Sequence, residues 1–114
     1  LDDPQPIFGQ NDVFINFILN NEIIELPNKY QLYPVYPNPF NPIATIRYDI
    51  PEYSNVAIEV FNVLGKRVDV LFTGMQYAGG HEIKWNGSGH PSGLYLIRMT
   101  SHEFNFTEKV MLVK

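Results

Sequence analysis

A dense run of prolines constrains this chain more than any other feature. Pro37, Pro39 and Pro42 occupy three of six consecutive positions within residues 36–42. Each proline fixes its own φ, removes a backbone donor and disfavours helical geometry in the residue before it. The segment therefore cannot be helical, and we interpret it as a stiff, extended entry into a folded module.

The residues after this proline segment alternate between apolar and polar side chains, as β-strands do. Turn signals recur every eight to twelve residues, and no apolar period of 3.6 residues persists for ten residues. We therefore predict an all-β fold, an antiparallel sandwich of about seven strands. Strands are predicted over 43–50, 56–61, 67–72, 81–85, 94–100 and 104–113, with a loop over 73–80.

A strongly apolar stretch precedes the proline segment. Residues 13–19 and 22–26 are apolar, β-branched runs on either side of Asn20 and Asn21, and asparagine tolerates positive φ. We predict a β-hairpin here; the alternative is one long strand with a central kink. Residues 1–12 are polar and contain proline and glycine, so we expect a mobile arm.

Length and composition limit the class of protein. A chain of 114 residues suffices for one domain with a core and is too short for two ordinary domains. We divide it into an N-terminal arm, hairpin and linker over 1–35 and a folded module over 36–114. A content of 45% hydrophobic and 14% aromatic residues argues against disorder.

Charge and hydropathy exclude several partners. The net charge is −4 and no basic block occurs, which argues against nucleic acid as a partner. No apolar run approaches the eighteen residues that a transmembrane helix needs. The chain begins with Leu1 and shows no signal peptide, so we expect a processed mature form or a fragment.

Catalytic and metal-binding patterns are missing from the sequence. The absence of cysteine excludes disulfides, iron–sulfur clusters and zinc-thiolate sites. His81, His90 and His102 lack the spacing of metal ligands. No pair of acids is forced together by spacing, and no serine lies in a nucleophile-elbow pattern. We therefore expect no enzymatic activity, no cofactor and no metal site.

Three blocks of the sequence, in this order and spacing, resemble the type A C-terminal sorting domain of the type IX secretion system. The first is the proline segment with 45–48 and 60–65; the second is 78–81 with 85–87; the third is 92–95 with Arg98 and 109–114. The resemblance covers residues 36–114. It implies an immunoglobulin-like sandwich, related to the domain of the flagellar hook-capping protein.

The resemblance also implies a function. It predicts export across the outer membrane of a Bacteroidetes-like bacterium, recognition by the outer-membrane secretion machinery, and a secreted or cell-surface location with removal or surface attachment. The motif positions it implies are Pro37, Asn38, Pro39, Phe40, Asn41, Pro42, Gly65, Trp85, Gly87, Gly93, Tyr95, Lys109 and Lys114.

Several of these motif positions also have a structural role that follows from their residue type. The glycines lie where chain reversals need permissive dihedrals. Trp85 and Tyr95 are large anchors for a small core. On the final strand, either Met111 and Val113 or Leu112 would be buried. A terminal strand of fixed sequence could be captured by strand addition, which a transporter could read.

The aromatic residues before and around the first strand leave two interpretations open. They could form a platform that stacks on carbohydrate, or they could cap the end of the sandwich and hold the proline segment. We favour the capping role. The residues concerned are Tyr30, Tyr33, Tyr36, Phe40 and Tyr53.

The apolar hairpin before the module is too hydrophobic for a solvated tail. It could pack on its own sandwich, or it could add to the open edge of a neighbouring subunit and build a homo-oligomer or filament through residues 13–26. The assembly residues would be Phe14, Ile15, Phe17, Ile18, Ile23 and Ile24.

Overall fold

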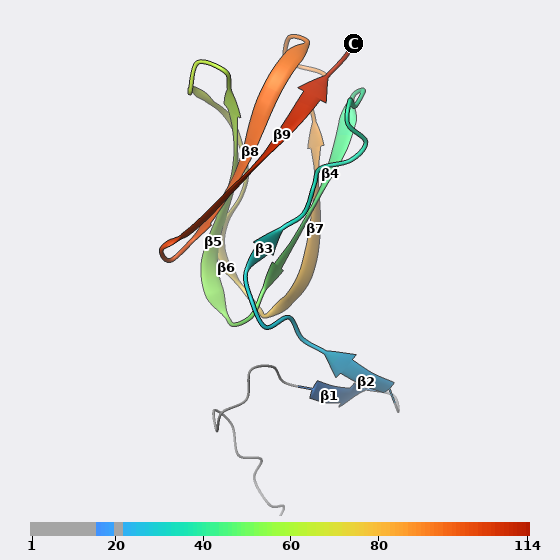
Figure 1. Ribbon diagram of the computed structural model, residues 1–114, viewed down its shortest axis with the longest axis vertical. Coiled ribbons are helices and arrows are strands. Elements are labelled where there is room, and N and C mark those ends of the chain that lie inside the picture. Colours follow the sequence, from blue (N-terminus) through green and yellow to red (C-terminus); the bar gives the residue numbers. More distant parts are fainter. Residues whose placement is uncertain (1–15, 20–21) are drawn as a thin grey trace, which may run out of the picture.

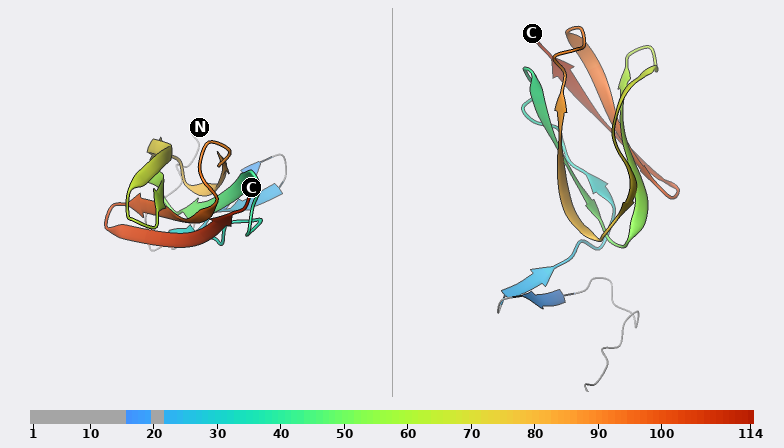
Figure 2. Two further views of the ribbon diagram at one scale, coloured as in Figure 1. Left: turned by 90° about the horizontal axis from the view of Figure 1, so that it is seen from above. Right: turned by 180° about the vertical axis from the view of Figure 1, so that it is seen from behind.

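The computed structural model describes residues 16–19 and 22–114, which form β-strands joined by turns (Figure 1). Seven of the strands build two antiparallel sheets that face each other as a sandwich, which confirms the predicted fold class (Figure 2). The described residues contain no helix. Nothing in this part of the chain is therefore a helix long and apolar enough to cross a membrane.

The two sheets have different sizes. The smaller has the order β3-β4-β7 and the larger has the order β6-β5-β8-β9. The strands are β3 (Gln31–Leu32), β4 (Ile43–Ile50), β5 (Ser54–Asn62), β6 (Arg67–Gln76), β7 (Gly79–Asn86), β8 (Gly93–Ser101) and β9 (Phe104–Leu112).

The core lies between the sheets and follows from the period of two in each strand, because successive side chains of a strand point to opposite faces. This agrees with the alternation of apolar and polar residues in the sequence, because the β-branched and aromatic residues on one face of β4 and β5 are all buried. They are Ile46, Tyr48 and Ile50 of β4 and Val56, Ile58 and Val60 of β5. On β9, Val110 and Leu112 are buried and Met111 and Val113 are exposed, so the second predicted alternative is correct.

The predicted N-terminal hairpin is confirmed. β1 (Asn16–Leu19) and β2 (Glu22–Glu25) pair antiparallel and form a two-stranded sheet of their own. Phe17, Ile18, Ile23 and Ile24 lie on these strands. Phe14, Ile15, the turn residues 20–21 and the arm over 1–12 lie outside the described residues.

Contacts with the sandwich begin before residue 36. Tyr30, Leu32 and Val35 are buried members of the core, and β3 pairs with β4. The Tyr30 ring also stacks on Phe104 at the start of β9, with 4.8 Å between ring centroids. Several residues before residue 36, the start of the predicted module, therefore belong to the same sandwich.

The predicted loop over 73–80 is wrong. β6 continues to Gln76 and β7 begins at Gly79, so only residues 77–78 connect them. Gly74 sits inside β6 opposite Val56, at a φ of 142° that a side chain would disfavour. Glycine is typical of loops, but pairing with β5 keeps residues 73–76 extended and pairing with β4 keeps Gly79 and Gly80 extended, since cross-strand contacts outweigh local preference.

The proline segment carries the chain from one sheet to the other. At its start, Tyr36 exchanges backbone hydrogen bonds with Thr45 of β4, at 3.2 and 2.7 Å. At its centre, Phe40 forms a parallel bridge to Leu112 of β9. The Phe40 amide donates to the Met111 carbonyl at 2.9 Å, and the Val113 amide donates to the Phe40 carbonyl at 3.0 Å. The segment thus closes one side of the sandwich.

Gly87 shows how closely the proline segment packs. Its amide donates to the Pro42 carbonyl at 2.8 Å. A Cβ atom at this position would lie 3.0 Å from Leu112 Cδ2 and 3.2 Å from Phe40 Cε2, tighter than ordinary van der Waals contact. A side chain here would therefore force the buried Leu112 and Phe40 side chains to shift.

We expect Gly87→Ala to lower the free energy of unfolding by about 1–3 kcal/mol, because the added methyl group overpacks the core. Gly89→Ala in the same loop is the matched control, since a Cβ there meets no atom within 4 Å. Urea denaturation of both variants measures the difference. Equal stabilities would contradict the close packing of the proline segment.

Candidate functional site

The segments that carry the sorting-motif residues gather at one end of the sandwich (Figures 1 and 2). We call this end the C-terminal pole and define it by the proline segment, the 62–66 turn, the 87–92 loop and residues 113–114. The linker that follows β2 joins the sandwich at the opposite end. The described strands β1 and β2 therefore lie at the end of the sandwich away from the pole.

Three aromatic residues form the interior of the pole. The Trp85 ring lies 5.4 Å from the Phe40 ring and 5.1 Å from the Tyr95 ring, measured between centroids. Trp85 Nε1 donates to Asp69 Oδ2 at 3.0 Å, which ties β7 of one sheet to β6 of the other. The Tyr95 hydroxyl donates to the Pro91 carbonyl at 2.6 Å. All three rings are buried, so they shape the pole from within.

Asn38 holds the proline segment along the outer edge of β9. Its Nδ2 donates to the Lys109 carbonyl at 3.2 Å, and its Oδ1 accepts from the Met111 amide at 3.0 Å. Together with the Phe40 bonds, these contacts occupy the backbone edge from 109 to 113. Capture of this part of β9 by strand addition, as considered from the sequence, would require displacing the proline segment.

The last residue is also tied to the pole. The Lys114 amide donates to Ser92 Oγ at 3.1 Å, and Lys114 Nζ donates to the Ser88 carbonyl at 2.7 Å. Lys109 is exposed on β9. The end of the chain is therefore held in place, with its charges on the surface.

The two remaining motif glycines serve turns. Gly65 and Gly93 have φ of 85° and 154°, values that favour glycine. Gly65 closes the β5–β6 turn, whose tip exposes Val63 by 65% and Leu64 by 88%. This turn lies apart from the aromatic cluster and adds apolar surface to the pole. Pro37, Pro39, Asn41 and Pro42 are exposed.

Sequence reasoning missed three contributors to the pole. Asp69 binds the indole of Trp85, and Ser88 and Ser92 bind Lys114. Asp69 stands between Val68 and Val70 in an apolar strand, and an acid in such a run was the available signal. The serine contacts had no sequence signal, because they depend on where the chain end comes to lie.

The structure favours the capping role of the aromatic residues. Tyr30 and Phe40 are buried in the core, so they offer no face to a sugar. The Tyr53 ring packs on the Tyr77 ring at the linker end, with 4.8 Å between centroids. Tyr36 is half exposed, and its backbone pairs with β4.

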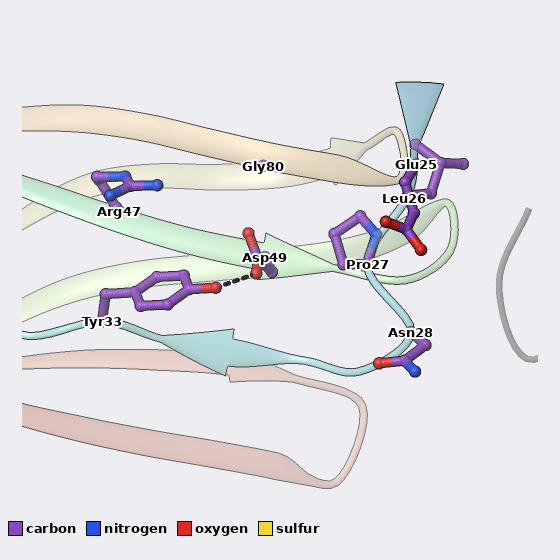
Figure 3. A pocket seen from close by; sticks show the side chains of 8 residues that line it. All are labelled: Glu25, Leu26, Pro27, Asn28, Tyr33, Arg47, Asp49 and Gly80. Carbon is purple, nitrogen blue, oxygen red and sulfur yellow. Dashed lines mark hydrogen bonds between the residues drawn. The ribbon is translucent and has the colours of Figure 1, made fainter. Parts of the chain in front are cut away.

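A polar pocket lies on the outer face of the smaller sheet, beside the linker (Figure 3). The Tyr33 hydroxyl donates to Asp49, and the Arg47 guanidinium lies 5.3 Å above the Tyr33 ring. A Cβ atom on Gly80 would lie 3.3 Å from the Asp49 carboxylate. The hydrogen bond to Asp49, followed by partial burial, raises the pKa of Tyr33 above its usual value of 10.

This pKa predicts an alkaline effect on stability. Because the folded-state pKa of Tyr33 is raised, its contribution is fully present below pH 10 and is lost as the pH rises through the folded-state pKa. We expect Tyr33→Phe to show a shallower loss of unfolding free energy between pH 9 and 11 than the wild type. Urea melts across this range measure both slopes; parallel slopes would contradict the hydrogen bond.

Comparisons with known proteins agree with this architecture. Residues 34–114 match the family described as Secretion system C-terminal sorting domain. No curated protein matches the chain. A solved structure with a similar fold is the crystal structure of dimeric latent PorU from Porphyromonas gingivalis, with a TM-score of 0.55 and 23% identity. The alignment covers 69% of this chain and 9% of that one, so it shows the fold alone.

The family match begins just before the proline segment and includes six of the seven sandwich strands, β4 to β9, with β3 lying before it. The motif residues that it includes meet at the pole. The chain therefore belongs to the type IX secretion C-terminal sorting domain family, non-catalytic signal domains that mark proteins for export to the cell surface or the extracellular space.

Proposed function

We propose that the C-terminal pole is the surface by which the outer-membrane secretion machinery recognises this module. The supporting observation is the convergence of the proline segment, the 87–92 loop and the chain end on one face opposite the linker. A protein attached before the module leaves this face open. The secretion machinery then binds the folded surface of the pole, because the backbone edge of β9 from 109 to 113 is already occupied by the proline segment.

The chemistry of the pole fits a protein partner. Val63 and Leu64 expose apolar side chains at a turn tip, where they can enter a pocket of another protein. Lys109 and Lys114 place positive charge nearby. Charged groups around an apolar contact steer association and fix its orientation. After export, we propose that the module keeps its passenger attached at the cell surface.

A charge-reversal experiment tests the pole. We expect Lys109→Glu/Lys114→Glu in the module, fused after a reporter, to lower the exported fraction several-fold in a bacterium with a type IX system. Lys29→Glu, an exposed lysine at the linker end, is the control and should export normally. Immunoblots of cells, washed cell surface and medium measure export and attachment.

Stability must be measured alongside export. The melting temperatures of the reversed-charge and control modules should agree within a few degrees, since all three lysines are exposed. Normal export of the double variant would refute recognition through these charges.

A second function, assembly through the N-terminal hairpin, is favoured by one observation. β1 and β2 form a sheet separate from both sheets of the sandwich, and an isolated two-stranded hairpin is marginal in water. We propose that this apolar hairpin contacts a second copy of the chain, which gives an oligomer or a filament if the contact repeats head to tail.

Deleting residues 1–26 tests assembly, because the remaining chain keeps both sheets of the sandwich. We expect the mass of the full chain, measured by sedimentation velocity, to rise with concentration, and that of the deleted chain to stay monomeric. An unchanged assembly state after deletion would rule the hairpin out as the joint. Export depends on the pole and should survive the deletion.

A further inference from the structure

A second pocket lies on the outer face of the larger sheet, near the β5–β6 turn. It is lined by Phe61, Gly65, Leu96, Arg98 and Thr107 and has a volume of about 260 Å³. The residues come from three elements: β5 and its turn, β8 and β9. Phe61 and Leu96 are directly opposite each other in the sheet, so they form an apolar floor.

Arg98 supplies the polar side of this pocket. Its guanidinium carbon lies 4.2 Å above the Phe61 ring, and its Nη2 lies 3.8 Å from Glu59 Oε1. Glu59 is already engaged through its other oxygen by Arg67, at 2.9 Å. Among the described residues, buried Arg98 Nε has no hydrogen-bond partner. The Arg98 side chain as a whole is 39% exposed, so the accessible part of its guanidinium can still donate to an acceptor from outside.

The charges around the pocket define the chemistry of that acceptor. Arg67 and Arg98 face a single carboxylate, Glu59. Lys66 follows Gly65 in the turn, and Lys109 pairs with Leu96. Two guanidinium groups thus share one carboxylate beside the apolar floor, which leaves a net positive charge there. The fitting ligand is a carboxylate on a peptide that also presents apolar side chains, because a guanidinium binds carboxylates through paired hydrogen bonds.

Residues 1–26, which we call the acidic arm, combine carboxylates with apolar side chains as this ligand requires. Residues 1–26 contain five of the twelve acids, Asp2, Asp3, Asp12, Glu22 and Glu25, and no lysine or arginine. The rest of the chain holds the other seven acids and all eight lysines and arginines. The acids of the arm flank the apolar residues 13–19 and 22–26. The arm is thus complementary to the pocket in charge and in hydrophobicity.

We propose that the Arg98 pocket receives the acidic, apolar arm of a second copy of this chain. Arg98 binds a carboxylate of the arm, and Phe61 and Leu96 contact an apolar side chain beside it. The linker enters the sandwich at the end opposite the β5–β6 turn, so the neighbour's arm reaches the pocket in a head-to-tail arrangement (Figure 1). This inference rests on the proposed assembly function and names its acceptor site.

Sedimentation velocity of the full-length chain over a range of concentrations tests the pocket. We expect Arg98→Ala to weaken self-association at least about tenfold, since a charged hydrogen bond is lost. Lys84→Ala is the control, because Lys84 is a cation on β7 of the other sheet and lines neither the Arg98 pocket nor the Tyr33 pocket. It should associate like the wild type within about threefold. Equal association of the Arg98 and Lys84 variants would overturn the proposal.

Two further full-length variants separate pocket binding from folding. Thr107→Trp fills the pocket from an exposed position and leaves Arg98 intact, so it should weaken association while urea stability is retained. Arg98→Glu should fail to associate alone and should recover when mixed with a chain carrying Glu22→Arg/Glu25→Arg. Failure of this rescue together with normal association of Thr107→Trp would also overturn the proposal.

The outcomes distinguish this inference from the assembly on which it rests. If Glu22→Arg/Glu25→Arg abolishes association but the Arg98 and Thr107 variants do not, the arm drives assembly and the acceptor site is elsewhere. If the wild-type chain stays monomeric at every concentration, both the assembly function and the pocket proposal are refuted.

Discussion

The hydrogen bonds between Phe40 and the end of β9 hold this sandwich closed. They join the segment that enters the module to the strand that ends it, so the two sheets are tied along one side by residues far apart in sequence. The buried Phe40 ring then packs on Trp85, and Trp85 in turn reaches Asp69 on the other sheet. One contact therefore links the proline segment, the core and the chain end.

The same contact controls which edges of the sandwich are available. Unpaired strand edges invite pairing with other chains, and proteins block them with bulges, charges or covering segments. The proline segment covers the edge of β9 from 109 to 113, and β6 carries register shifts opposite β5. Glu108 stands opposite inward-facing Ile97 on the rest of β9. Strand addition is thus opposed at the two edges of the larger sheet.

The C-terminal pole contains both buried and exposed motif residues. Trp85, Gly87 and Tyr95 are buried, so changes there act through the shape of the pole. Lys109 and Leu64 are exposed and can touch a partner directly. The absence of cysteine is consistent with a core that relies on packing alone.

The sequence by itself determined the strands, most turns and the family. Alternating apolar residues predict β4 and β5, and prolines exclude a helix, since both are local signals. The order and spacing of the motif blocks along the chain indicate the sorting domain. Loop 73–80 was mispredicted because its glycines resemble turn signals, and only pairing with β5 shows otherwise. Tertiary structure alone decided that Asn38 meets Lys109, that Ser88 binds Lys114 and that Arg98 lines a pocket. These contacts join distant segments, and no local pattern encodes which strands become neighbours.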